Sequence, residues 1–376
     1  MPTQQSSKFP SLDSLPVHAT IYIAFAEINK YVAHVMSGVE TFHFEIELSH
    51  DDIKSLNDLL QDAIQAVGSA LDKGAAFENA YQELARRGNY AYKRIFARDL
   101  QRVSKALAGG AGKVIQVVSD SFFVPWDLLY DGPLGMSTTI DGYWGTRYCI
   151  RRSIEAVENA RGYTLPSQLE TPRPKVGLVT SDRLPSVLSE EIPEMERLHD
   201  CKRIKLEHLH DLSVTKRSEE LQELDSFLRQ EWHFLHFACH AYEMNPLDLS
   251  YLSVTKDFSI SMIDFTINNF DLSYHPFVIL NACRTGVTNP LYTSSWARKL
   301  WELGARGVLA TDFKVRDDFA ALFSKALYRN LLGGVPIGKA LLKARWQFWK
   351  RKHNPLGLAY ALFSPPSIRV IKPHKP

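Results

Sequence analysis

The chain has 376 residues, 45% hydrophobic and 23% charged, which is typical of an ordinary globular protein with one large or two ordinary domains. The net charge of +2 argues against nucleic acid as the main partner, and neither a signal-peptide pattern nor an apolar run of 18 residues is visible. Four separated cysteines form no CxxC pair, so we expect reduced thiols and a cytoplasmic protein without membrane contact.

The first part of the sequence predicts a mixture of strands and helices. Residues 19–52 are rich in β-branched and aromatic residues with turn-like interruptions, which predicts three short strands. Ser49 is a suitable helix cap, and helical periodicity then continues as far as Gly109. Residues 113–118 predict another strand, followed by the stretch FFVPWDLLYDG. We therefore expect an α+β arrangement for this part.

The segment at residues 160–174 is rich in proline and polar residues, and predicts a boundary that divides the chain into residues 1–165 and 166–376. After the boundary, strands alternate with helices, which indicates a mostly parallel sheet with helices on both faces. The predicted strands are residues 175–181, 203–209, 233–239, 277–283, 306–313 and 357–364. The predicted helices are residues 189–199, 213–230 (with Ser213 as its cap), 293–303, 316–332 and 336–353.

Two of these strands run into reactive groups. HFLHFACHA reaches His240, and FVILNACRTG reaches Cys283. Because the carboxyl ends of parallel strands meet at one edge of the sheet, the two side chains can lie close together. A Cys–His pair performs acyl transfer, and backbone N–H groups past a strand end can bind the oxyanion. The alternative is that Cys283 is only a buried core residue, as free cysteines often are.

The neighbouring residues have plainer interpretations. His236 lies on the same strand face as His240 by period two, and we interpret it as a structural residue rather than a catalytic one. Cys239 alternates to the opposite face and is expected in the core. A zinc site formed by these residues and Cys283 has suitable ligand types, but the spacing matches no usual zinc pattern.

The motifs around this pair resemble those of the CHAT family of caspase-like cysteine peptidases. HFLHFACHA followed by FVILNACRTG is similar to the family's His and Cys motifs, and residues 304–363 resemble its tail. VPWDLLYDG resembles the family's Pro-Trp-Glu-Leu-Leu element, with Asp127 at the Glu position. The resemblance covers roughly residues 110–371.

The resemblance implies a caspase-like sheet, preceded by an α+β part that resembles the family's catalytically empty half. It implies that Cys283 is the nucleophile and His240 the general acid and base, with no metal or organic cofactor. The oxyanion hole would be the backbone N–H groups of Cys283 and Ala241. The family usually has glycine where this chain has Ala241, and a positive φ at this position would favour glycine.

The resemblance also bears on substrate selection. In caspase-like folds the strand after the cysteine strand lines the pocket for the residue before the scissile bond. Asp312, at the end of this strand, would favour Arg or Lys there by charge pairing, or would only cap or pair locally. Arg284 follows the nucleophile, where an arginine favours the thiolate, although a solvated Arg284 is the alternative.

These features favour an endopeptidase that cleaves a protein partner. The resemblance implies activation by a partner, or by a change in the long irregular stretch expected at residues 241–274, and a role in bacterial defence. The rival is a catalytically inactive CHAT-like binding module, favoured only by Ala241. A nucleic-acid-binding protein is a third candidate, based on WQFWKRKH (residues 346–353), whose helical spacing instead indicates an amphipathic core helix with a basic end.

Overall fold

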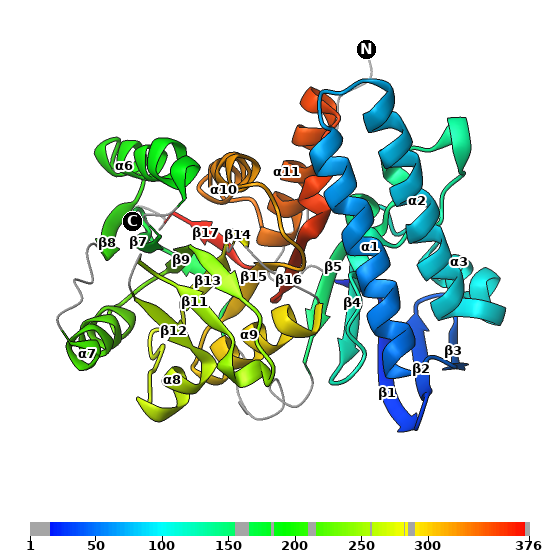
Figure 1. The fold of residues 1–376 in the computed structure, drawn as a ribbon, viewed down its shortest axis with the longest axis horizontal. Helices are drawn as coiled ribbons and strands as arrows, with labels where there is room; N and C mark the ends of the chain where they lie inside the picture. Colours follow the sequence, from blue (N-terminus) through cyan, green and yellow to red (C-terminus); the bar gives the residue numbers. More distant parts are fainter. Residues whose placement is uncertain are drawn as a thin grey trace, which may run out of the picture.

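The structure is a computed structural model, which describes residues 16–154, 165–181, 184–209, 216–255, 258–281, 283–284 and 290–372. Within these residues the chain forms two large sheets and two smaller ones, with helices packed around them (Figure 1). The two large sheets lie side by side, so strands from both halves of the sequence meet in the middle of the molecule. None of the described helices is both long and apolar enough to cross a membrane.

The N-terminal sheet has five described strands in the order β3-β2-β1-β4-β5. The three strands expected in residues 19–52 are confirmed, with the first beginning two residues earlier, and they form an antiparallel meander in which buried side chains alternate with more exposed ones. β4 pairs in parallel with β1, and β5 pairs in parallel with β4. The strands are β1 (Val17–Glu27), β2 (Lys30–Ser37), β3 (Thr41–Ile46), β4 (Val114–Ser119) and β5 (Cys149–Ser153).

Helices pack on this sheet, and the first of them begins at the predicted cap. The Oγ of Ser49 accepts the N–H of Asp52 at 3.0 Å, and Oδ2 of Asp52 accepts the N–H of Ser49 at 2.9 Å. The reciprocal cap confirms the helix start that the sequence predicts. The helical segments are α1 (His50–Ala70), α2 (Ala75–Phe96), η1 (Ala97–Asp99), α3 (Leu100–Leu107), η2 (Trp126–Leu128), η3 (Gly135–Ser137), η4 (Ile140–Gly142) and α4 (Trp144–Arg147).

The C-terminal sheet has six described strands in the order β16-β15-β13-β9-β7-β8. All neighbouring pairs are parallel except β15 and β16, which confirms the mostly parallel sheet. The four central strands are almost continuously buried, as in parallel sheets covered on both faces. The strands are β7 (Lys175–Thr180), β8 (Lys205–Leu209), β9 (Phe234–Ala238), β13 (Phe277–Leu280), β15 (Gly307–Thr311) and β16 (Tyr360–Phe363).

Each face of this sheet packs against its own helices, so the hydrophobic core consists of two clusters. Ile279 points into the cluster with α6, α10 and α11, and its neighbour Val278 points into the cluster with α7, α8 and α9. This confirms the expectation of helices on both faces (Figure 1). The helices are the π-helix η5 (Val187–Glu191), α6 (Ile192–Asp200), α7 (Arg217–Leu228), α8 (Met262–Ile267), α9 (Pro290–Glu302), α10 (Asp317–Leu331) and α11 (Ile337–Lys352). The expected cap Ser213 lies outside the described residues.

The prediction of an irregular stretch at residues 241–274 is wrong. This region contains two short strands and α8, and it forms most of a four-stranded sheet in the order β12-β11-β10-β14. Strands of three residues are too short for an alternating pattern to stand out in the sequence. The elements are β10 (His240–Tyr242), η6 (Leu247–Leu249), β11 (Tyr251–Ser253), β12 (Ser259–Ser261) and β14 (Cys283–Arg284).

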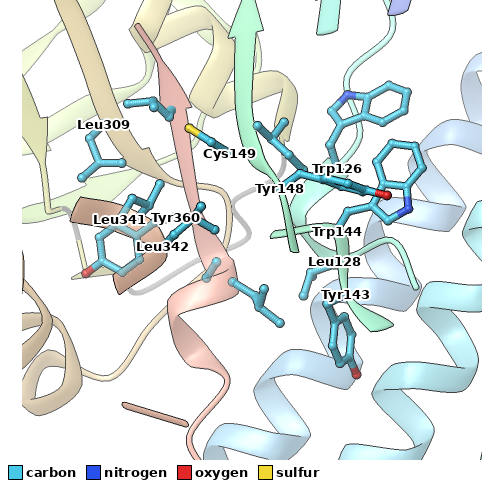
Figure 2. Close-up of a cluster of buried hydrophobic side chains, with 14 of the residues drawn as sticks. Trp126, Leu128, Tyr143, Trp144, Tyr148, Cys149, Leu309, Leu341, Leu342 and Tyr360 are labelled. Carbon is cyan, nitrogen blue, oxygen red and sulfur yellow. The ribbon is translucent and has the colours of Figure 1, made fainter. Parts of the chain in front are cut away.

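The two halves of the chain share one hydrophobic cluster, which runs from the helices of the N-terminal half to α10 and α11. Figure 2 draws part of this cluster, in which Tyr148 and Cys149 lie between Trp126 and Trp144 of the first half and Leu341 and Tyr360 of the second. A two-stranded parallel sheet, β6 (Gln168–Glu170) with β17 (Arg369–Ile371), joins the segment after the expected boundary to the end of the chain. The division at residue 165 stays a prediction, and any two domains would be tightly packed together.

The helix that contains WQFWKRKH packs against the core, as its spacing predicts. Leu342 is buried, and Trp346 and Trp349 are partly buried against the shared hydrophobic cluster. Nε1 of Trp346 donates to the carbonyl oxygen of Thr146 at 2.9 Å, which ties α11 to the first half. The basic residues of the last turn complement the helix C-terminus.

Candidate active site

The two candidate catalytic residues lie on strands that leave the C-terminal sheet together. β9 and β13 are parallel neighbours, with His236 opposite Ile279. Both strands end at the edge of this sheet, and the chain continues from them as β10 and β14. These two strands again pair in parallel, in the small sheet. In this second pairing His240 is the register partner of Cys283.

The structure therefore brings together the backbones of the two residues that the sequence singles out. Neighbouring strands are about 4.8 Å apart, which is within reach of an imidazole and a thiol on adjacent strands. The strand expected at residues 277–283 is interrupted after Leu280, so the pair lies on the small sheet rather than at the end of the main one. The side chains of Cys283 and Arg284 lie outside what the structure describes.

His240 is half-buried at the start of β10. Its ring makes an edge contact with Tyr242, with centroids 6.3 Å apart, and Tyr242 stacks on Tyr251 of β11 at 4.7 Å. β11 pairs antiparallel with β10, with Ser253 opposite His240. Strands on both sides thus hold the backbone of His240, which limits the positions its imidazole can take.

Ala241 occupies a place where alanine is not strained. It lies inside β10, with Leu252 as its partner on one side and Arg284 on the other, and it is 1% exposed. It is not among the residues with positive φ. The backbone here does not require the glycine that the family usually has, because an extended residue has no clash with its Cβ.

Asp312 follows β15 but does not face an open pocket. Its side chain is fully buried, and its two carboxylate oxygens accept hydrogen bonds from Arg152 of β5 at 3.0 and 2.6 Å. Burial raises the pKa of Asp312 to about 6, although the adjacent Arg152 opposes the shift. A basic substrate side chain would reach Asp312 only after Arg152 moved away, because among the described residues Arg152 already occupies the position facing the carboxylate.

Arg152 belongs to a buried chain of four alternating charges that crosses between the two halves. It also donates to Asp127 at 2.9 Å, and Asp127 pairs with Arg345 of α11 at 2.8 Å. The two carboxylates keep the pKa of Arg152 raised although burial lowers it. Asp127 occupies the Glu position of the VPWDLLYDG element. Its contacts with Arg152 and Arg345 explain why an acidic residue is needed in that position.

His236 is a core residue. It has no exposed surface, and its Nε2 lies 3.0 Å from Oε1 of Glu191, close enough for an ion pair although the angle is not that of a hydrogen bond. Its Nδ1 lies 3.2 Å from the hydroxyl of Tyr328, on which the imidazole stacks. This environment agrees with the structural interpretation of His236.

Asn281 and Glu191 form a buried polar cluster with His236, and neither residue was predicted from the sequence. Asn281 is the polar residue within the apolar run FVILNAC, and this was the signal that could have found it. Glu191 carries no such signal, because a glutamate at a helix end is usually interpreted as a surface residue. Cys239 is buried as expected, and burial raises its pKa to about 12.

A cleft begins where β10 ends. Two hollows of about 600 and 520 Å³ share Phe123, Leu247 and Leu291 in their walls, so they adjoin. Glu243, the residue after Tyr242, lines the second hollow. The walls come from the first half of the chain, from the segment after β10 and from α8 and α9, and they combine apolar side chains with charged groups of both signs. Among the described side chains, no three His, Cys, Asp or Glu are grouped as metal ligands.

The mostly parallel sheet, with helices on both faces and a His and a Cys on paired strands at its edge, defines a caspase-like protein. Two crystal structures of the Saccharomyces cerevisiae separase–securin complex are similar over 94% of this chain, with TM-scores of 0.55 and 0.53 and sequence identities of 9% and 10%. This chain spans 30% of the separase chain in both cases, and at such identity the likeness shows the fold alone.

The sequence comparison gives the family. Residues 90–373 match the model of the CHAT domain, which is most of the chain. The chain therefore belongs to the CHAT family of caspase-like proteases. No curated protein matches the chain.

Proposed function

We propose that this protein is a cysteine endopeptidase with Cys283 as nucleophile and His240 as general acid and base. The thiolate sulfur of Cys283 attacks the peptide carbonyl carbon, and the protonated His240 gives its proton to the amine as the C–N bond breaks. Water, deprotonated by His240, then hydrolyses the thioester and restores the thiol. The N–H groups of Ala241 and Cys283 are the proposed oxyanion hole. These steps need no metal or organic cofactor.

The observation that carries this proposal is the parallel pairing of β10 with β14, in which His240 is opposite Cys283. The extended backbone at Ala241 adds support, because the alanine that favoured an inactive binding module is unstrained here.

We assign the substrate polypeptide to the cleft that begins after β10, because this cleft adjoins the segment that carries His240. The walls of this cleft carry charges of both signs, so they do not favour substrate side chains of one charge. A preference for Arg or Lys through Asp312 would require the ion pair with Arg152 to open, and Arg284 is the other proposed substrate contact.

We also propose that a separate protein partner activates the chain, or that the small sheet rearranges. β10 belongs to this sheet, so a shift of its neighbour β11 would move His240 directly, and a shift of β12 would act through β11. The separase structures contain securin, so one protein with a similar fold forms a complex with another protein. The proposed role in bacterial defence rests on the family resemblance alone, and a cytoplasmic location rests on the cysteine pattern.

The test is covalent labelling of the purified protein by peptide acyloxymethyl ketones with Arg or Leu before the reactive group. We expect labelling of the wild type that is lost in Cys283→Ala and in His240→Gln but kept in Cys201→Ala, which removes an exposed thiol. Labelling that persists in Cys283→Ala would refute the nucleophile. If neither the wild type nor any variant were labelled, even with candidate partner proteins added, the result would favour the inactive binding module.

A further inference from the structure

Glu191 is a fully buried carboxylate that contacts both strands leading to the candidate site. It ends the π-helix η5 and lies against His236 of β9 on one side. On the other side, Nδ2 of Asn281 donates to the two oxygens of Glu191 at 3.2 and 3.4 Å. Asn281 directly follows β13 and His236 lies in the middle of β9, so the side chain of Glu191 bridges two neighbouring strands.

Asn281 is held by three further contacts. Its backbone N–H donates to the carbonyl of Phe237 at 2.9 Å, and its Nδ2 lies 3.3 Å from the carbonyl oxygen of Ala320 in α10. The hydroxyl of Tyr360 in β16 donates to its Oδ1 at 2.7 Å. Because four structural elements fix this residue, the chain leaves β13 in one defined position.

The charge of Glu191 is expensive to bury. Among the described residues its only recorded ionic partner is His236, and no Lys or Arg pairs with it. Burial of the Tyr328 hydroxyl raises the pKa of Tyr328 well above the usual value, and the negative charge of Glu191 raises it further. Replacing a buried ionic group by apolar residues is often neutral or favourable for stability, so a buried carboxylate in this place suggests a role other than stability.

The two anchored residues are close to the candidate catalytic pair along the chain. Asn281 is two residues before Cys283, and His236 is four residues before His240. At about 3.3 Å per extended residue, the backbone from each anchor to Cys283 and His240 spans at most about 7 and 13 Å. An error of about 1 Å in the placement of reacting groups can reduce a rate by about a hundredfold.

We propose that Glu191 is a positioning residue, which sets the separation of His240 and Cys283 by clamping the middle of β9 to the end of β13 through His236 and Asn281. The inference rests on the proposed function for its effect on the reaction. The clamp itself is a structural claim that can be tested without activity.

The decisive test exchanges the amide and the carboxylate. Asn281→Asp breaks the pair, because it leaves two buried carboxylates facing each other. Glu191→Gln weakens the pair, because Nδ2 of Asn281 then donates to a neutral amide oxygen instead of a carboxylate. The double variant restores one amide and one carboxylate with reversed roles, and Tyr360 can still donate to residue 281, while the bond to the carbonyl oxygen of Ala320 is lost. If the clamp holds the strands, the double variant recovers part of what Asn281→Asp loses.

Two further variants keep the test meaningful if a single variant folds poorly. Tyr360→Phe removes only the hydroxyl that bonds Asn281. Tyr143→Phe is the matched control, because its hydroxyl is equally buried and has no hydrogen-bond partner in the described structure. Thermal unfolding of every variant identifies general loss of stability.

The first readout is hydrogen exchange of peptides that span residues 234–242 and 277–284. We expect at least tenfold faster exchange in Asn281→Asp, smaller increases in Glu191→Gln and Tyr360→Phe, and no change in Tyr143→Phe. The double variant should exchange at least threefold more slowly than Asn281→Asp. Unchanged exchange in both single variants, or a double variant no better than Asn281→Asp, would overturn the proposal.

The second readout is the rate of inactivation by the acyloxymethyl ketone that labels best. We expect the maximal inactivation rate to fall at least tenfold in Asn281→Asp and by less in Glu191→Gln, with the half-saturating concentration within threefold of wild type in both, and to recover in part in the double variant. The pH midpoint of inactivation should not move, because Glu191 acts on position. A wild type that is not labelled would refute the proposed function, while the exchange readout would still decide the clamp.

Discussion

Asp127 and Arg345 form an ion pair of 2.8 Å in which each side chain is only 1% exposed. Asp127 lies in the η2 turn of the first half of the chain, and Arg345 lies in α11 of the second. Arg345 also donates to the carbonyl oxygens of Gly357 and Tyr360, at 2.9 and 2.6 Å. The pair thus fixes the position of α11 against both the first half and the edge strand of the C-terminal sheet.

Asp127→Ala should lower the free energy of unfolding by about 3–5 kcal/mol, because Arg345 and Arg152 would lose a shared buried counter-charge. Chemical denaturation measures the loss. Arg316→Ala is the control: it breaks an exposed ion pair with Asp318 and should cost at most about 1 kcal/mol. Equal losses in the two variants would show that burial of the Asp127 pair contributes nothing.

Gly338→Ala should destabilise the protein by about 1–3 kcal/mol, because the new Cβ would clash with Sγ of Cys149 and lie 2.7 Å from Cβ of Pro366. Cys149, on β5, is drawn in Figure 2 beside the core residues of the junction. Cys149→Ala makes room for the methyl group, so the double variant should lose less than the sum of the two single variants, by at least about 0.5 kcal/mol. Strict additivity in denaturation curves would contradict this packing.

The stability conferred by Asp264 should depend on pH. Burial alone raises the pKa of Asp264, but the N–H and Oγ of Ser261, both at 2.7 Å, and the ion pair with Arg217 hold this pKa below its usual 3.8. Because the folded pKa is the lower one, this stabilisation is complete above the unfolded value and is lost as pH falls through the folded value.

The difference in unfolding free energy between wild type and Asp264→Asn should therefore be largest near pH 6 and shrink below about pH 4. Denaturation series between pH 6 and pH 3 measure this difference. A gap that stays constant over the whole range would show that the ionised Asp264 is not stabilised in the fold.

The described cysteines should differ sharply in reactivity. Burial raises the pKa of Cys149 and that of Cys239 to about 12, so almost no thiolate forms at neutral pH, whereas Cys201 is exposed. Iodoacetamide at pH 8 should label Cys201 in the native protein and leave Cys149 and Cys239 unmodified until denaturant is added. Peptide mapping measures this, and native labelling of Cys239 would mean that the core near β10 opens.

Most of the fold could be predicted because its signals are local. The apolar runs of β7, β9, β13 and β15 and the helix caps, such as the one at Ser49, are contained in short stretches of sequence. The nearness of His240 and Cys283 could be predicted from topology, since both follow parallel strands.

The rest depends on contacts between distant parts of the chain. Asp312 carries the same charge whether it faces a substrate or Arg152, and only the packing of β5 against the C-terminal sheet decides between them. The carboxylate of Glu191 is likewise buried by elements far from it in sequence, so its neighbours along the chain give no sign of its contact with Asn281.

The buried chain of Arg345, Asp127, Arg152 and Asp312 has a consequence for how such proteins can evolve. Two of these residues come before the expected boundary at residue 165 and two come after it. Recombination at the boundary between distant relatives would place Arg345 and Asp312 against foreign neighbours. Such a recombinant should therefore be stable only where both parents supply acidic and basic residues at these four positions.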